Sequence, residues 1–106
     1  MKNAILWAGL LALVAGTAGA SGEHVVNQKG KTFSHKRLVV KVGDTVRFTN
    51  EDPFAHNVFS LSDTKSFDLG SYGQGQAKSV HLDKAGLVDV ECAVHPDMRM
   101  TIEVQR

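Results

Sequence analysis

Apolar and polar residues alternate along most of the chain that follows the first twenty residues. Val88, Val90 and Cys92 share one parity, for example, and the acids Asp89 and Glu91 take the other. A period of two is typical of a strand with one buried face, and no stretch after residue 20 shows helical apolar spacing over ten residues. The pattern predicts an all-β sandwich of seven or eight short, mostly antiparallel strands, near residues 24–28, 38–42, 45–49, 56–61, 67–69, 79–82, 87–92 and 100–105.

The same parity sorts side chains between the interior and the solvent. We expect the interior to hold apolar residues from three of these segments and three phenylalanines, namely Leu38, Val40, Val42, Val88, Val90, Met100, Ile102, Val104, Phe54, Phe59 and Phe67. We expect two histidines and four loop acids to be exposed to solvent, namely His35, His81, Glu51, Asp52, Asp63 and Asp97. The glycine-rich segment 70–75 is expected to form a turn.

The first twenty residues differ in kind from the rest. A basic start at Lys2 precedes the apolar run of residues 4–14, and small residues then lead to Ala18-Gly19-Ala20. This order is typical of a signal peptide cut after Ala20, and the apolar run is too short for a comfortable membrane span. The sequence therefore predicts a removed signal over residues 1–20, and a single exported domain over residues 21–106 in the periplasm of a bacterium.

The charge balance restricts the class of partner. Lys2 is the only charged residue of the first twenty, so residues 21–106 carry eleven basic and eleven acidic side chains. A neutral surface argues against nucleic acid as a partner, because nucleic-acid binding needs clustered cations, and it argues against long-range electrostatic steering. We expect a monomer without a membrane span.

Cys92 is the only cysteine of the chain. Exported proteins usually carry cysteines in pairs, and a lone one can form no internal disulfide. The thiol is therefore either a buried, inert core group or a metal ligand. The residues that follow Cys92 in the sequence decide between a core thiol and a metal ligand.

The segment Cys92-Ala93-Val94-His95-Pro96-Asp97-Met98 places a thiol, an imidazole and a thioether within seven residues. By parity Cys92 ends a strand with its sulfur facing inward, and His95 and Met98 then follow on one loop. His56 opens a strand elsewhere and is the candidate fourth ligand. Two imidazoles, a thiolate and a weak axial thioether describe a type 1 (blue) copper site, whose soft and borderline ligands suit both Cu(I) and Cu(II).

These motifs resemble the plastocyanin and amicyanin branch of the cupredoxins. The resemblance rests on Cys92-x-x-His95-Pro96-x-Met98, on Ala85-Gly86 before it and on His56-Asn57-Val58, and it covers roughly residues 38–104. It implies a Greek-key sandwich with one copper ion held by His56, Cys92, His95 and Met98. It also implies that His95 lies in an apolar surface, to which Phe54 or Ala55 would contribute, and that Asn57 ties the first ligand's strand to the cysteine loop.

The chain departs from that branch in ways that leave alternatives open. Ala93 and Val94 stand where the branch commonly has Thr-Pro, so the hydrogen bonding near the sulfur is not specified. Met100 offers a second thioether, although its parity favours the core and the loop spacing favours Met98. A cut after Ser21 instead of Ala20 would expose Gly22-Glu23-His24, whose amine, amides and imidazole can chelate Cu(II) in a square plane.

The resemblance implies an electron carrier, not an enzyme, that meets redox proteins such as a dehydrogenase or a cytochrome in transient complexes. The same ligands would also serve a copper buffer, resistance factor or delivery protein. A cysteine hydrolase would need an activating base and has no use for the methionine. Zinc could accept the other ligands, but a thioether is a poor zinc ligand.

Overall fold

The computed structural model describes residues 22–106, so the predicted signal peptide lies outside the described part of the chain. Ten strands follow one another within it: β1 (Glu23–Val26), β2 (Gln28–Lys29), β3 (Thr32–Phe33), β4 (Arg37–Lys41), β5 (Thr45–Thr49), β6 (His56–Ser62), β7 (Lys65–Tyr72), β8 (Ala77–His81), β9 (Gly86–Cys92) and β10 (Arg99–Gln105). The eight longer strands correspond to the eight predicted segments. The two-residue strands β2 and β3 form a small hairpin that the sequence pattern does not reveal.

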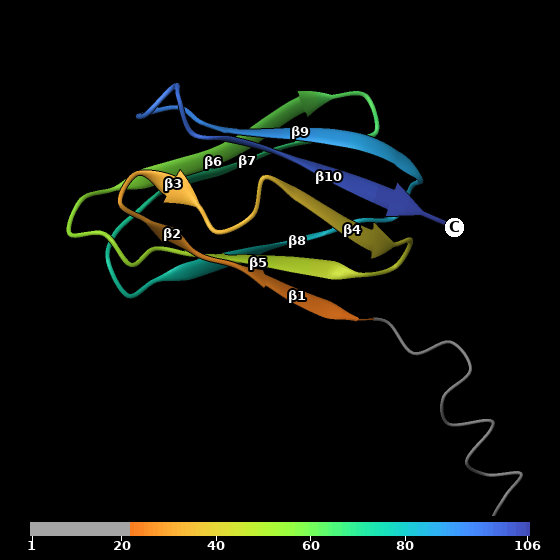
Figure 1. The fold of residues 1–106 in the computed structure, drawn as a ribbon, viewed down its shortest axis with the longest axis horizontal. Coiled ribbons are helices and arrows are strands. Elements are labelled where there is room, and N and C mark those ends of the chain that lie inside the picture. The colour runs from red at the N-terminus through yellow and green to blue at the C-terminus, as the bar shows by residue number, and fades with distance from the viewer. Residues whose placement is uncertain (1–21) are drawn as a thin grey trace, which may run out of the picture.

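Two sheets face each other across one hydrophobic core (Figure 1). The larger sheet has the order β4-β10-β9-β6-β7 and the smaller one the order β1-β5-β8. The pairs β1–β5 and β4–β10 are parallel, and the other paired strands are antiparallel. The predicted all-β sandwich is therefore confirmed.

The core consists of the inward-facing residues of both sheets, as the alternation predicts. Its members are Val26, Val40, Val46, Phe48, Val58, Tyr72, Val80, Leu82, Val88, Val90, Met100, Ile102 and Val104. Val42 and Phe59 were expected in the interior, and both expectations were wrong. Val42 follows the end of β4 and is 41% exposed, and Phe59 is only partly buried and lies outside the core cluster, because Val58 takes the inward parity of β6. The turn expected over residues 70–75 was also misplaced, since residues 70–72 continue β7.

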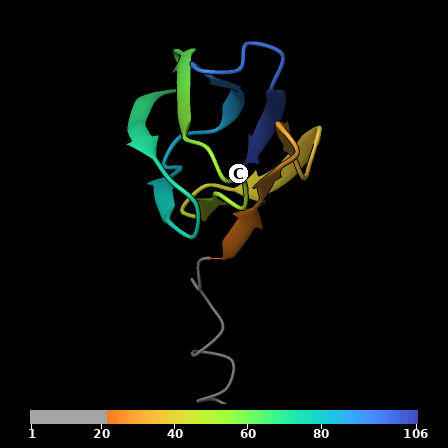
Figure 2. The same cartoon turned by 90° about the vertical axis from the view of Figure 1, so that its left-hand side faces the viewer.

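Several connections gather at one end of the sandwich, on the left in Figure 1 and facing the viewer in Figure 2. They include the β2–β3 hairpin, the β5–β6 loop, the β7–β8 loop and the β9–β10 loop. The predicted ligands lie on or beside two of these loops, and the core keeps the strands that carry them in fixed register. Within residues 22–106 no helix is long and apolar enough to cross a membrane.

Candidate metal centre

Cys92 is the last residue of β9, and its side chain is 1% exposed. It pairs with Val58 of β6, which brings the sulfur next to the start of that strand. The backbone N–H of Asn57 donates a hydrogen bond to Cys92 Sγ at 3.4 Å. The predicted inward orientation of the thiol is confirmed, and the Asn57 N–H holds the sulfur next to the start of β6.

His56 opens β6 and is fully buried. The loop before it is shaped by Asn50, whose side-chain N–H groups donate to the carbonyl oxygens of Phe54 at 2.9 Å and Tyr72 at 3.0 Å. Asn50 Oδ1 in turn accepts a hydrogen bond from the backbone N–H of Asp52 at 2.8 Å. One buried amide therefore satisfies the loop's backbone and fixes the point at which His56 enters the strand.

Asp52 was expected in solvent, and this expectation was wrong. Its carboxylate is buried, lies 2.8 Å from His56 Nε2, and accepts hydrogen bonds from the backbone N–H groups of Gly30 at 2.7 Å and Lys31 at 3.1 Å. Burial pushes the pKa of Asp52 upward, but the hydrogen bonds from His56, Gly30 and Lys31 outweigh it and hold the pKa below its usual value.

The Asp52 contact decides which nitrogen of His56 is available to a metal. Because Nε2 faces a carboxylate, that nitrogen carries the proton, and Nδ1 keeps its lone pair. Nδ1 points at the thiol, 3.6 Å from Cys92 Sγ. The sequence pattern identified His56 but not Asp52. The only local indication of a role for Asp52 is that it lies four residues before His56.

Three donor atoms converge at this end of the sandwich. The Nδ1 atoms of His56 and His95 lie 3.6 Å and 3.8 Å from Cys92 Sγ, and the three ligand atoms all lie within 4.8 Å of one another. Metal bonds of about 2.0 Å to nitrogen and 2.3 Å to sulfur, arranged trigonally, require donor separations of about 3.6 Å. The side chains therefore fit one soft or borderline ion.

His95 forms the outer wall of the cluster and is only partly buried. Burial of its ring lowers the pKa of His95, and repulsion from His56 and Lys31 lowers it further, against a smaller opposing effect of Asp52. These effects favour the neutral ring, which is the form that binds a metal.

Phe54 was expected first in the core, but it is 37% exposed. Its ring centroid lies 5.5 Å from that of His56 and 5.3 Å from that of His95. Val94, next to His95 in the sequence, is 52% exposed. We use the name His95 face for Phe54, which contacts the His95 ring, together with the exposed sequence neighbours of His95, namely Ala93, Val94 and Pro96. Phe54 therefore takes the alternative position, in an apolar surface beside the metal site.

Met98 and Met100 lie in different environments. Met100 belongs to the hydrophobic core. Met98 is also buried but lies outside that core cluster, on the loop, where its backbone N–H donates to the carbonyl oxygen of His95 at 2.9 Å. This backbone contact turns the loop back toward His95. Met98 thus stays a candidate ligand on the loop, whereas Met100 is packed in the core.

Asn57 links the two loops through its backbone. The N–H of Ala93 donates to the Asn57 carbonyl oxygen at 2.9 Å. The side-chain amide, however, donates to Asp68 Oδ1 of β7 at 2.7 Å. The tie between the strand of the first ligand and the cysteine loop is therefore present, but the Asn57 side chain is turned toward another strand.

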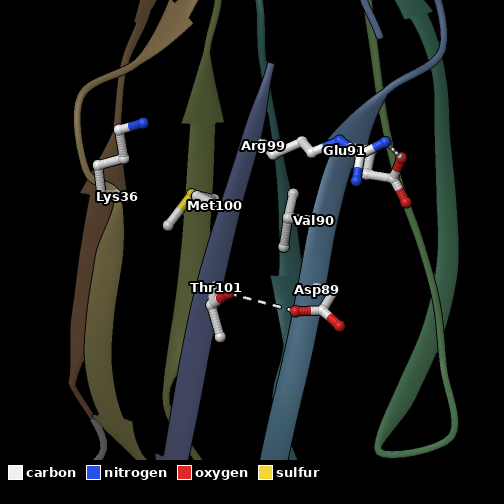
Figure 3. Close-up of a pocket in the computed structure, with 7 residues that line it drawn as sticks. All are labelled: Lys36, Asp89, Val90, Glu91, Arg99, Met100 and Thr101. Carbon is white, nitrogen blue, oxygen red and sulfur yellow. Dashed lines mark hydrogen bonds and ion pairs between the residues drawn. The ribbon is translucent and has the colours of Figure 1, made fainter. Parts of the chain in front are cut away.

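The remaining histidines lie apart from the cluster. His24 Nε2 is 2.8 Å from Asp44 Oδ2 at the opposite end of the sandwich, His81 is exposed as predicted, and His35 contacts Ser34. A hollow of about 450 Å³ on the outer face of β9 and β10 also lies apart from the ligand cluster (Figure 3). Its floor is a polar sheet surface on which Thr101 donates to Asp89 and Arg99 pairs with Glu91, so we assign it no chemistry.

Comparison with known proteins agrees with this geometry. The family described as copper binding proteins, plastocyanin/azurin family, matches residues 20–105. Amicyanin of Paracoccus denitrificans is 32% identical over 96 residues, which cover 81% of this chain and 68% of that protein. The methylamine utilization protein MauL of Methylorubrum extorquens is 34% identical over 68 residues, which cover 63% of this chain and 60% of that protein.

Solved structures show the same fold. A reduced mutant of amicyanin superposes with a TM-score of 0.73 at 31% identity, over 83% of this chain and 87% of that one. A copper-containing nitrite reductase from Thermus scotoductus reaches a TM-score of 0.74 at 27% identity, over 79% of this chain but 22% of the reductase. The fold, the ligand cluster and the family match agree: this chain belongs to the plastocyanin/azurin family of copper-binding proteins.

Proposed function

We propose that the protein is a type 1 copper electron carrier whose ligands are His56, Cys92, His95 and Met98. The observation that carries this proposal is the convergence of three donor atoms within 4.8 Å of one another, from two strands and a loop. Bound copper supplies the Cu(I)/Cu(II) couple. The loop position of Met98 supports it as the axial ligand.

The residues of the chain hold the site in one geometry. Asp52 fixes the His56 ring, the Asn57 N–H fixes the sulfur, and the Met98 N–H closes the loop on His95. Ligands that are preorganised in this way move little when charge changes, which favours rapid electron exchange. The partly exposed ring of His95 gives a partner its closest approach, and the apolar residues of the His95 face suit a small transient interface.

The proposed cellular location and partners rest on the sequence. A signal over residues 1–20 would deliver a monomeric domain of residues 21–106 to the periplasm, where a dehydrogenase and a cytochrome would be the donor and acceptor. The similarity to amicyanin and to a methylamine utilization protein supports a role in amine oxidation.

The test is visible absorption of the copper-loaded protein with and without Cys92→Ser. We expect an intense thiolate-to-copper band that the serine variant lacks, since the hydroxyl cannot replace the thiolate. Met98→Leu should shift the band and the reduction potential, whereas Met100→Leu should leave both unchanged. A band that persists in Cys92→Ser would exclude Cys92 as the ligand.

A second measurement separates electron transfer from copper handling. The reduced, copper-loaded protein should exchange electrons with a cytochrome c much faster than it gives Cu(I) to a metal-free acceptor. Rapid transfer of Cu(I) with slow electron exchange would instead identify a delivery protein.

A further inference from the structure

The tip of the β2–β3 hairpin has an unusual residue in its turn. Lys29 and Thr32 pair across the hairpin, and the two residues between them, Gly30 and Lys31, have φ angles of +64° and +58°. A two-residue turn with both φ values positive suits glycine or asparagine at both positions. Lys31 is the only non-glycine residue with positive φ in the described chain, so a long cationic side chain occupies a position that disfavours it.

The strained turn is held in place by the metal site. Asp52 accepts the backbone N–H groups of both Gly30 and Lys31, and the same carboxylate contacts His56. Backbone strain persists where its surroundings over-determine it, and it concentrates at functional positions. The strain at Lys31 therefore raises the question of what its side chain does there.

The turn directs Lys31 to the His95 face. Its Nζ lies 5.7 Å from the centroid of the Phe54 ring, and the Phe54 ring lies 5.3 Å from that of His95. Lys31 is exposed and makes no ion pair within residues 22–106. A free cation therefore borders the apolar surface on which the His95 ring opens.

A second free cation lies on the same side. Lys31 and Lys36 both line a small hollow next to Met98, together with Asp97 and Arg99. Arg99 is partly neutralised, because its guanidinium lies 3.6 Å from Glu91 and it donates to the Pro96 carbonyl oxygen. Figure 3 shows Lys36 on the far side of Met100 from that pair, and Lys36 makes no ion pair in the described chain. Asp97 is the only acid that lines this hollow.

We propose that Lys31, supported by Lys36, is a docking residue that selects a redox protein with carboxylates beside its own electron-transfer edge. This inference rests on the proposed function, since it concerns the surface through which the electron leaves. The chain as a whole is nearly neutral, so the contact acts at short range, on the orientation and lifetime of the complex, and salt screens it.

The test uses two small oxidants of opposite charge. The reduced protein gives one electron to ferricyanide, which becomes ferrocyanide, or to tris(phenanthroline)cobalt(III), which becomes the cobalt(II) complex. At low ionic strength Lys31→Glu should slow the reaction with ferricyanide roughly threefold to tenfold and speed the reaction with the cobalt cation. The matched control is Lys84→Glu, an equal charge change on the exposed β8–β9 connection at the other end of the sandwich, which should change neither rate.

A neutral variant separates docking from folding. Lys31→Asn removes the cation and tolerates positive φ, so the metal-free variant should unfold at a denaturant concentration equal to or above that of the wild type. Its rate with an acidic cytochrome c should nevertheless fall, while its rate with a basic cytochrome c should not.

The outcomes are distinct. Equal rates for the Lys31 and Lys84 variants, with normal electron exchange, would overturn the docking role and leave the electron carrier intact. Absence of electron exchange in the wild-type protein would overturn the proposed function itself.

Discussion

Two histidine–aspartate pairs lie at opposite ends of the sandwich, and only one of them belongs to a metal site. In each pair the Nε2 atom lies 2.8 Å from an Asp Oδ2 atom, in His56–Asp52 and in His24–Asp44. Each aspartate also accepts two backbone N–H groups, those of Gly30 and Lys31 for Asp52 and those of Gly22 and Lys41 for Asp44.

The difference lies on the other side of the imidazole ring. His56 Nδ1 meets Cys92 Sγ at 3.6 Å, whereas His24 belongs to no cluster of three metal-binding side chains within residues 22–106. A carboxylate orients a histidine in both places. A metal site requires, in addition, that other segments bring a second and a third donor to the free nitrogen.

The largest expected effect comes from removing each imidazole in turn. His56→Ala should lower the affinity for copper by at least about a hundredfold, because one of three strong ligands is lost. His24→Ala should leave the affinity unchanged. Competition of each variant with a chromogenic copper chelator measures both values, and a large loss in His24→Ala would mean that His24 also binds copper.

Removing the charge of each aspartate should give a smaller contrast. Asp52→Asn keeps the size of the side chain but weakens its hold on the His56 ring, and loss of such an outer contact typically costs tenfold to a hundredfold in metal affinity. Asp44→Asn should not change copper binding. If the two variants bind copper equally well, the orientation of His56 does not depend on Asp52.

The smallest expected effect is the dependence of stability on pH at the Asp44 end. Hydrogen bonds from the Lys41 backbone, from His24 and from the Gly22 backbone lower the pKa of Asp44 from 3.8 to about 2. Because the folded pKa is depressed, the stabilisation is complete above the ordinary value and is lost as the pH falls through about 2. We expect about 1–2 kcal/mol of the free energy of unfolding to disappear over this range.

Urea denaturation of the metal-free protein between pH 5 and pH 2 measures this loss. Asp44→Asn should be less stable than the wild type at pH 5 and should approach it at pH 2. Parallel curves for the two proteins would show that Asp44 contributes no pH-dependent stability.

The sequence predicts what depends on neighbours along the chain. Alternation located the eight longer strands, the inward thiol of Cys92 and the core position of Met100, because the parity of a strand is a local property. The spacing of the cysteine loop likewise predicted His95 and Met98 as companions of the sulfur.

The residues that sequence reasoning missed depend on distant contacts. Asp52 is buried because Gly30 and Lys31, more than twenty residues away, supply N–H groups to its carboxylate. Without that hairpin the segment Asn50-Glu51-Asp52-Pro53 has the composition of a solvated loop. Phe54 was misplaced for the same reason, since its ring contacts two histidine rings at a steep angle, and only the folded chain brings those rings together.

The burial of the single thiol has a consequence for its reactivity. Cys92 is 1% exposed, at the point where β9 pairs with Val58 of β6. Sulfur that is shielded in this way reacts slowly with peroxide, alkylating reagents and other thiols. The fold itself therefore shields the one thiol of the ligand cluster, and we expect the metal-free protein to resist oxidation and alkylation at Cys92.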